Sequence, residues 1–343
     1  MRYFSPLFFV SCGLSAPLFG LGSSGEDSRT TTPVALATVN ATLLRPAQFA
    51  RAAYCSGASL KAQTCGGPCD SLKGVTFLQT GGDQGLVPFY FIAHDTVQKN
   101  IVVAHEGTHT ANVLSILNDV DFVRTDIDTS RFPQAAGQGI EVHSGFQDTF
   151  QRTADSILAG VRSALNSTGV TTVVVTGHSQ GASLAMITGA MLKLSLAPSV
   201  KVVVTTFAPL RVGNKAWADF LDSKVGVTFV TNQKDPVPTV PPLILGFTHP
   251  SGEIHIVDSS QKNLVACPGH DNEHCAAGNS ILHDSVANHL GAQAVINDLA
   301  RTELMPDWQH GPISEHCIPR GIPDVSQHAR AARAFALDRD NPI

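Results

Sequence analysis

The sequence predicts an α/β protein whose central sheet is mostly parallel and carries helices on both faces. Two observations support this prediction. Apolar runs rich in β-branched residues recur along the chain, and helical patterns fall between them. The 343 residues are also 43% hydrophobic and only 15% charged, whereas an average domain has roughly 25% charged residues. Such a chain can bury a large core, which excludes disorder of the whole chain.

The expected strands are short and apolar on both faces, as in strands buried inside a parallel sheet. They cover Val87–Ala93, Ile101–Ala104, Thr172–Val175, Val202–Phe207 and Val227–Val230. The expected helices fall between later strands and cover Phe146–Leu165, Ala182–Leu196 and Lys215–Leu221. Helical crossovers of this kind join parallel neighbours.

The N-terminus has the features of a secretory signal peptide. Arg2 supplies a positive charge, residues 7–14 are mostly apolar, and small residues follow up to residue 24. The apolar run is shorter than the ~20 residues of a membrane-spanning helix, and no later run reaches that length. We therefore expect a secreted, extracellular protein without a transmembrane segment. Acceptor sequences for N-glycosylation at Asn40 and Asn166 agree with that route.

The chain divides into a leader, one domain and a tail. We expect a signal peptide over residues 1–22 with an open cleavage point, and a flexible N-terminal arm over 23–42. A single domain then covers 43–317, because no repeat or linker interrupts it, and a tail covers 318–343. The net charge is -5 and no Lys/Arg-rich run is present, so nucleic acid is not an expected partner. We expect a monomer.

Six cysteines remain after the signal peptide, which contains Cys12. An even number in a secreted chain indicates three disulfides, although six cysteines allow fifteen connectivities. Close spacing favours two local loops, which leaves the first and last cysteine as a pair: Cys65–Cys69, Cys267–Cys275 and Cys55–Cys317. A zinc site is disfavoured because no second cysteine pair stands at ligand spacing, and we expect no metal.

A buried strand over Thr172–Val175 leads into Gly177-His178-Ser179-Gln180-Gly181 and then into an apolar helix. This is the strand-turn-helix setting of a nucleophile elbow. Gly177 and Gly181 are needed because strand and helix pass closely at so sharp a turn. Ser179 would then be the nucleophile, and the backbone amide of Gln180 at the helix N-terminus would stabilise an oxyanion.

Six motifs, the elbow among them, follow one another along the chain. The others are Ala52-Ala53-Tyr54-Cys55, Ile101-Val102-Val103-Ala104 leading to Gly107-Thr108, Val142-His143-Ser144-Gly145-Phe146, Thr206-Phe207-Ala208-Pro209-Leu210-Arg211-Val212-Gly213-Asn214 and Asn232-Gln233-Lys234-Asp235-Pro236-Val237-Pro238. In this order they resemble the class 3 family of secreted fungal lipases, over roughly residues 47–291. The resemblance implies the α/β-hydrolase fold and a serine hydrolase that needs no cofactor.

A serine hydroxyl needs a histidine to take its proton and a carboxylate to orient that histidine. In α/β-hydrolases the acid and then the base follow the nucleophile. Asp235 follows an expected strand, lies in a proline-rich loop and matches the family's acid, so it is preferred over Asp219 and Asp222, which fall in a helical pattern. Asp219 and Asp222 are expected to be surface charges.

The base must be chosen among six histidines that follow Asp235. The segment Asn288-His289-Leu290-Gly291 resembles the stretch around the family's catalytic histidine, so His289 is the expected base and His283 the alternative. The others are expected to have packing or surface roles, and they are His249, His255, His270 and His274. His178 beside the nucleophile is expected to be structural.

By the resemblance, Thr108 supplies the second oxyanion donor through its backbone amide and hydroxyl. His105 and Glu106, just before it, stand where the family often has Phe-Arg; they could change the charge near the oxyanion hole or serve only as loop residues. A lid is expected shortly afterwards, because its apolar residues fall on one stripe of a short helix: Val113, Ile116, Leu117 and Val120. Periodicity alone favours a core helix here, and the resemblance favours the lid.

Together these features predict a secreted serine ester hydrolase, foremost a triacylglycerol lipase that acts at an oil–water interface and releases fatty acids through an acyl-enzyme. An esterase of soluble or aromatic, feruloyl-type esters is an alternative, since the same fold and triad serve both. A non-catalytic lipid-binding protein is an alternative of another class, and it would lack a triad member.

Overall fold

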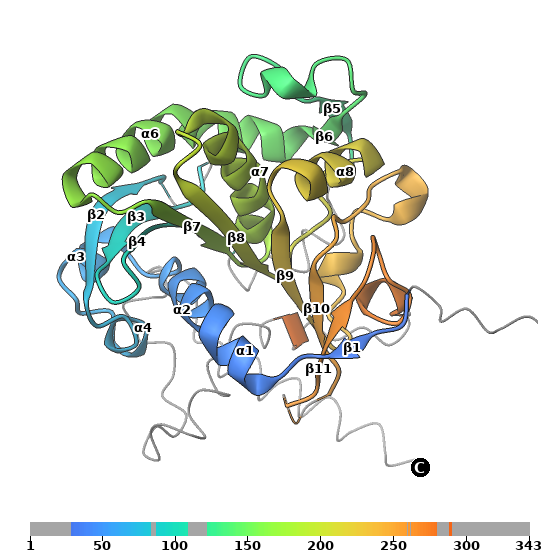
Figure 1. Ribbon diagram of the computed structural model, residues 1–343, viewed down its shortest axis with the longest axis horizontal. Helices are drawn as coiled ribbons and strands as arrows, with labels where there is room; N and C mark the ends of the chain where they lie inside the picture. Colours follow the sequence, from blue (N-terminus) through green and yellow to red (C-terminus); the bar gives the residue numbers. More distant parts are fainter. Residues whose placement is uncertain are drawn as a thin grey trace, which may run out of the picture.

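The computed structural model describes residues 29–83, 87–108, 122–258, 260, 262–279 and 288–289. Its centre is a sheet whose strands are β1 (Thr32–Pro33), β2 (Val75–Gly81), β3 (Tyr90–Asp95), β4 (Asn100–His105), β7 (Thr172–Gly177), β8 (Lys201–Phe207), β9 (Val227–Asn232), β10 (Glu253–Ile256) and β11 (Leu264–Cys267). The spatial order is β1-β11-β10-β9-β8-β7-β4-β3-β2 (Figure 1). From β10 to β4 neighbouring strands are parallel, and antiparallel pairs complete both edges. A separate hairpin pairs β5 (Arg124–Asp126) with β6 (Glu141–His143).

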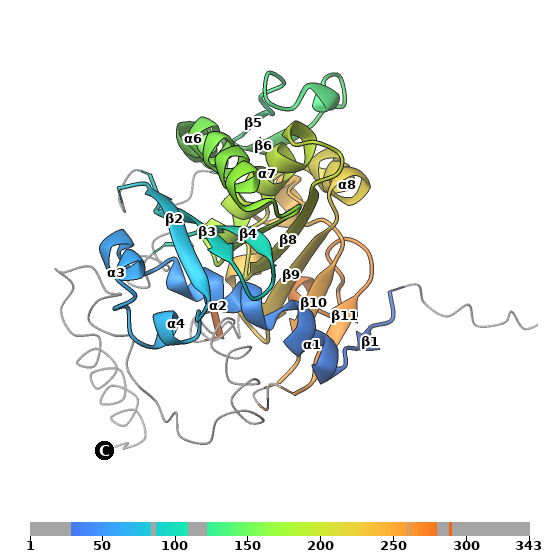
Figure 2. The same cartoon turned by 60° about the vertical axis from the view of Figure 1, so that its left-hand side comes forward.

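Helices cover both faces of the sheet, as expected (Figures 1 and 2). One face carries α6 (Ser144–Thr168), α7 (Gln180–Ser195) and α8 (Lys215–Lys224). The other carries α1 (Leu36–Thr42) and α2 (Leu44–Ala52), with α3 (Gly57–Lys61) and α4 (Gly67–Asp70) near its β2 edge. Short 3-10 turns are η2 (Pro133–Ala135), η3 (Val237–Thr239), η4 (Leu243–Leu245) and η5 (Ala276–Gly278).

The alternation of side chains along β4 shows why the central strands read as continuous apolar runs. Ile101 and Val103 point into the core beneath α6 and α7, whereas Val102 and Ala104 pack on the α2 side. All four side chains are fully buried. Because successive residues of a strand face opposite sides, a strand covered on both faces must be apolar at every position.

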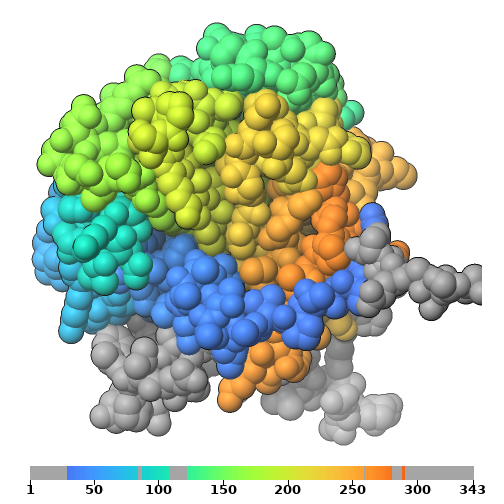
Figure 3. Space-filling model, viewed as in Figure 1, coloured from blue at the N-terminus to red at the C-terminus, as the bar shows by residue number. Residues whose placement is uncertain are grey.

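The expected N-terminal arm over 23–42 was wrong for its described part. Strand β1 pairs with β11, and Val39 on α1 is fully buried in a core cluster with Phe207, Val230 and Ile256. In the space-filling view the blue N-terminal segment lies against the orange β10–β11 region (Figure 3). Low apolar content misled the prediction, since the few apolar residues of the segment, Val34, Leu36 and Val39, all pack on this cluster.

Strand boundaries also differ from the prediction at the antiparallel edge. The strand expected to start at Val87 begins at Tyr90, after Pro88, which cannot donate a ladder hydrogen bond. Strands β2 and β11 were not among the predicted strands. Their residues are only partly buried at several positions, so they lack the long apolar run that identified the central strands. Strand β10 overlaps the segment 250–254, which resembles a strand of the family.

Two local disulfides are present, Cys65–Cys69 and Cys267–Cys275. Cys55 is also disulfide-bonded, while its expected partner Cys317 lies outside the described residues, so that pairing stays a prediction. The signal peptide, the lid residues Val113, Ile116 and Leu117, the alternative base His283 and the tail lie outside the described residues as well.

The two glycosylation acceptors lie on helices. Asn40 is half-buried on α1, and Asn166 is exposed in the last turn of α6. Glycosylation at both stays a prediction. Among the described helices, none combines the length and the hydrophobicity that crossing a membrane requires.

Candidate active site

Ser179 lies at the junction between β7 and α7, in a backbone conformation that L-residues rarely adopt. Its φ is 58° and its ψ is -131°, a region in which a non-glycine residue is strained and which is often found at active sites. A Cβ on Gly177 would lie 2.3 Å from the carbonyl oxygen of Gly181, and one on Gly181 would lie 2.5 Å from that of Glu106. Both positions therefore require glycine, because backbone atoms of neighbouring segments lie too close for a Cβ, as we expected from the sequence.

The expected oxyanion residues meet beside this turn. The Thr108 hydroxyl donates to the side-chain oxygen of Gln180, with 2.9 Å between the oxygens. Gln180 is the first residue of the 16-residue helix α7, whose N-terminus carries partial positive charge. A Cβ on Gly107 would lie 3.1 Å from the Cβ of Ser179, so the Gly107-Thr108 loop packs directly against the elbow.

Asp235 and His289 form a hydrogen-bonded pair in the interior. His289 Nδ1 lies 3.0 Å from Asp235 Oδ2, and the two side chains are 0% and 1% exposed. The other oxygen of Asp235 accepts the backbone N–H of Val237 at 2.9 Å. On the other side, the Asn232 side chain donates to the carbonyl oxygen of Asn288 at 2.8 Å and so ties the segment of His289 to the end of β9.

When the Nδ1–H of His289 donates a hydrogen bond to the Asp235 carboxylate, the neutral ring carries its lone pair at Nε2. This Nε2 atom is buried, and it has no hydrogen-bond partner within the described part of the chain. A buried nitrogen without a partner is costly, and its lone pair is available to accept a proton.

His178 connects the base to the nucleophile. Its ring stacks on that of His289, with 4.6 Å between ring centroids and 28° between planes. His178 Nε2 also lies 3.0 Å from the carbonyl oxygen of His289. Burial and the adjacent His289 hold the pKa of His178 well below its usual range. Since His178 precedes Ser179 in the chain, this stack brings His289 to the nucleophile turn.

The other candidate histidines have partners elsewhere. His249 Nε2 hydrogen-bonds the Pro238 carbonyl, and His255 Nδ1 hydrogen-bonds the Thr231 hydroxyl. Burial lowers the pKa of each to about 4. His274 is exposed, as expected.

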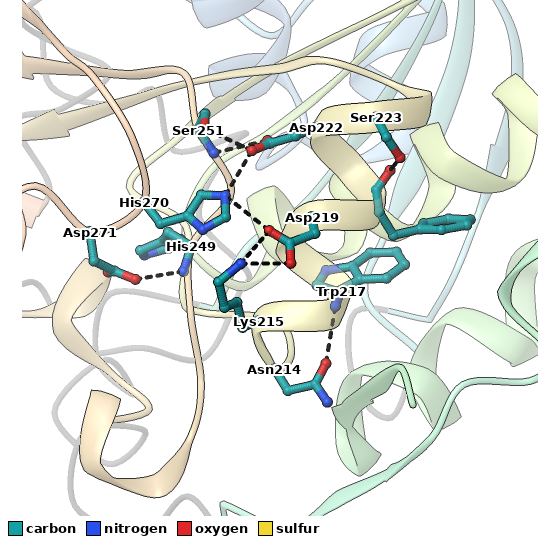
Figure 4. A network of polar contacts seen from close by, with 11 residues as sticks. Asn214, Lys215, Trp217, Asp219, Asp222, Ser223, His249, Ser251, His270 and Asp271 are labelled. Atoms are coloured by element: carbon teal, nitrogen blue, oxygen red, sulfur yellow. Dashed lines mark hydrogen bonds and ion pairs between the residues drawn. The ribbon is translucent and has the colours of Figure 1, made fainter. Parts of the chain in front are cut away.

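The rival acids Asp219 and Asp222 lie on α8, and none of their described contacts is with His289. Figure 4 shows Asp222 accepting from Ser251 and pairing with His270 at 2.7 Å, while Asp219 pairs with Lys215 at 2.7 Å. His270, expected at the surface, is only partly exposed because it bridges its disulfide loop to α8.

His105 and Glu106 are buried, with side chains 3% and 1% exposed. His105 Nε2 hydrogen-bonds the Thr188 hydroxyl on α7, and burial lowers its pKa to about 4. Glu106 Oε2 accepts the backbone N–H of Phe89 at 3.1 Å. Of the two possibilities left open for these residues, His105 is a neutral packing residue, and Glu106 places a carboxyl group near the oxyanion loop.

One described group has metal-like spacing: Glu253, Cys267 and Cys275. The two cysteines are joined in a disulfide, so no thiolate is available to a metal ion. This group does not fit a metal.

Sequence reasoning gave no role to Tyr54, whose hydroxyl lies 2.8 Å from His178 Nδ1. Its signal was its position in the Ala52-Ala53-Tyr54-Cys55 motif. The motif contributed to the family resemblance, but nothing in it indicates a contact more than a hundred residues away.

Comparisons with known proteins agree with this geometry. A family model described as lipase (class 3) matches residues 102–245. A secreted mono- and diacylglycerol lipase of Malassezia globosa is 30% identical over 270 residues, which span 78% of this chain and 84% of that protein. The chain belongs to the class 3 lipase family.

A second Malassezia globosa secreted mono- and diacylglycerol lipase is 33% identical over 214 residues. The aligned part spans 62% of this chain and 66% of that lipase, so the match covers just under two thirds of the relative's length. Among solved structures, a Yarrowia lipolytica lipase aligns with a TM-score of 0.68 and 25% identity over 76% of this chain and 96% of its own.

The Rhizomucor miehei triacylglyceride lipase aligns with a TM-score of 0.67 and 23% identity, covering 79% of this chain and 99% of its own. At that identity the likeness shows the fold alone, and the fold is that of the α/β-hydrolase lipases.

Proposed function

We propose that the protein is a secreted lipase that hydrolyses acylglycerol esters through an acyl-enzyme formed on Ser179. One observation carries this proposal. His289 is held between the Asp235 carboxylate and the ring of His178, the residue that precedes the strained Ser179. His289 thus lies between an acid and the turn that carries the proposed nucleophile, as acyl transfer by a serine requires, and the three residues come from segments far apart in the chain.

In this mechanism Ser179 Oγ attacks the ester carbonyl while His289 Nε2 takes the serine proton. Asp235 fixes the Nδ1–H tautomer of His289 and stabilises the imidazolium that forms. The backbone amides of Thr108 and Gln180 hold the negative oxygen of the tetrahedral intermediate, and the Thr108 hydroxyl supports this arrangement by donating to the Gln180 side chain. His289 then protonates the departing alcohol, and a water molecule, deprotonated by the same histidine, releases the fatty acid from Ser179.

A lipid substrate is supported by an exposed aliphatic tip. Leu243, Ile244 and Leu245 on η4 are 47%, 92% and 44% exposed. The loop behind them is fixed, because the buried Arg211 donates to the carbonyl oxygens of Thr239 and Pro241. The loop also follows Asp235 directly in the chain. A rigid, uncharged aliphatic turn suits contact with a hydrocarbon phase, since large exposed apolar side chains in a group mark interaction surfaces.

The names of the relatives favour partial glycerides, whereas the sequence led us to expect triacylglycerols. Titrating fatty acid release from emulsified tri-, di- and monoacylglycerol, and from soluble p-nitrophenyl esters, separates these substrates. A fluorophosphonate should label Ser179 in the wild type and leave Ser179→Ala unlabelled. Labelling at another residue would refute the assignment of the nucleophile, and a preference for short soluble esters without gain at an interface would refute the lipase.

A further inference from the structure

Two hydrogen bonds connect Tyr54 through the ring of His178 to His289. Tyr54 Oη lies 2.8 Å from His178 Nδ1, and His178 Nε2 lies 3.0 Å from the carbonyl oxygen of His289. A carbonyl oxygen can only accept, so Nε2 carries the proton of His178. In the neutral ring Nδ1 is then an acceptor, and the Tyr54 hydroxyl must donate to it.

The Tyr54 hydroxyl also packs against Gly107, the residue before Thr108. A Cβ on Gly107 would lie 2.4 Å from that oxygen and 2.4 Å from the carbonyl oxygen of His178. Only glycine allows this approach, and it brings the residue before Thr108 against the same hydroxyl group.

We propose that Tyr54 is a positioning residue that holds the oxyanion loop at Gly107 and the base His289 in register with Ser179, acting on His289 through the neutral ring of His178. The inference rests on the proposed hydrolytic function. Tyr54 touches no reacting atom in it, and its effect reaches the chemistry only through the two groups that it holds.

The direction of the Tyr54 bond matters for the charge beside His289. During acyl transfer His289 becomes an imidazolium, and a second positive ring stacked at 4.6 Å would oppose it. By donating to Nδ1, Tyr54 occupies the lone pair at which His178 would be protonated. The ionisable groups that contact this ring are Tyr54 and His289, and Asp235 lies behind His289. Burial and the charge of Glu106 both raise the pKa of Tyr54, which keeps its proton in place.

Tyr54→Phe removes this donor with little change in shape. Loss of one neutral hydrogen bond predicts a fall in kcat of about three- to tenfold, with KM on a soluble ester changed less than about twofold. Because His178 Nδ1 is then free to take a proton, the acid limb of the pH profile of kcat/KM should move to higher pH. A residue that only supports the fold would lower thermal stability without moving this limb.

Tyr90→Phe is the matched control. The Tyr90 hydroxyl also makes a short hydrogen bond, to Ser156 Oγ at 2.8 Å where β3 meets α6, and it has no contact with the elbow among the described hydrogen bonds. It should cost similar stability and leave kcat and the acid limb unchanged. If Tyr54→Phe and Tyr90→Phe behave alike in both kinetic readouts, the inference is overturned.

A second pair of variants keeps the test independent of the tyrosine. His178→Gln retains an amide donor that can reach the His289 carbonyl, whereas His178→Leu retains none, so the glutamine variant should keep several-fold more activity at equal thermal stability. Equal activities would overturn the role of His178. Absence of hydrolysis by the wild type would overturn the proposed function. A wild type that hydrolyses esters together with a Tyr54→Phe variant of equal activity would overturn only the role of Tyr54.

Discussion

Glu253 is a buried acid whose ionisation affects the stability of the fold. It is the first residue of β10 and is only 4% exposed. Its Oε1 atom accepts the Thr231 hydroxyl at 2.6 Å and the backbone N–H of Ala276 at 3.1 Å. Burial raises the pKa of Glu253 from 4.5 to about 7, against the opposite effect of these two hydrogen bonds.

The raised pKa means that ionisation of Glu253 destabilises the folded state. Between pH 4.5 and about 7 the unfolded chain has lost this proton and the folded chain still holds it, so stability falls as pH rises through that window. A pKa difference of this size, at about 1.4 kcal/mol for each factor of ten, corresponds to roughly 3 kcal/mol. The cost is absent below pH 4.5 and complete above pH 7.

Glu253→Gln keeps the accepting oxygen and removes the ionisation. Urea unfolding with intact disulfides should show the variant close to wild type at pH 4 and more stable by roughly 3 kcal/mol at pH 8. Glu273→Gln, the same substitution at an exposed position of the neighbouring loop, should show no such difference between the two pH values. If Glu253→Gln and the wild type have the same free energy of unfolding at pH 8, the ionised carboxylate is solvated in the folded state, and burial does not destabilise it.

Three further variants test the site and the tip. Asp235→Asn should lower kcat by roughly three to four orders of magnitude in a p-nitrophenyl ester assay, because the amide cannot hold the tautomer of His289; a loss below tenfold would exclude Asp235 as the acid. Gly181→Ala places a Cβ 2.5 Å from the carbonyl oxygen of Glu106, so thermal unfolding should show a loss of about 1–3 kcal/mol or more. Ile244→Ser removes three side-chain carbons and should weaken binding to acylglycerol droplets, measured by flotation, by roughly fiftyfold, since each buried methylene contributes about 0.8 kcal/mol; equal flotation would show that η4 does not enter the lipid.

The parts of the molecule that were predictable from sequence are those whose cause is local. The turn at Ser179 needs two glycines at fixed spacing between a strand and a helix. The strand, the glycines and the helix follow one another in the sequence. The central strands were equally legible, because burial on both faces removes polar residues from the whole run. Strand β1 was not predictable from the sequence, since it consists of two exposed residues and forms only by pairing with β11.

The choice of base shows where local reasoning ends. His249, His255 and His289 are all buried histidines downstream of Asp235, and composition gives no way to rank them. The family resemblance singled out His289, and the contact with Asp235 is its physical counterpart. His249 and His255 differ from His289 in the hydrogen-bond partners of their ring nitrogens. These partners are set by the tertiary structure and cannot be predicted from spacing along the chain.

The arrangement around Ser179 also explains why so many polar groups are buried there at a cost to stability. A base in the interior is useful only if one nitrogen stays free, so neighbours must hold the ring without occupying Nε2. In this structure Asp235 takes Nδ1, and His178 takes the backbone carbonyl and the ring face of His289. None of these contacts involves Nε2. An apolar neighbour could pack against the ring of His289, but it could not fix the tautomer. In the proposed mechanism the burial of His178 thus serves one requirement, a fixed base whose Nε2 lone pair stays open.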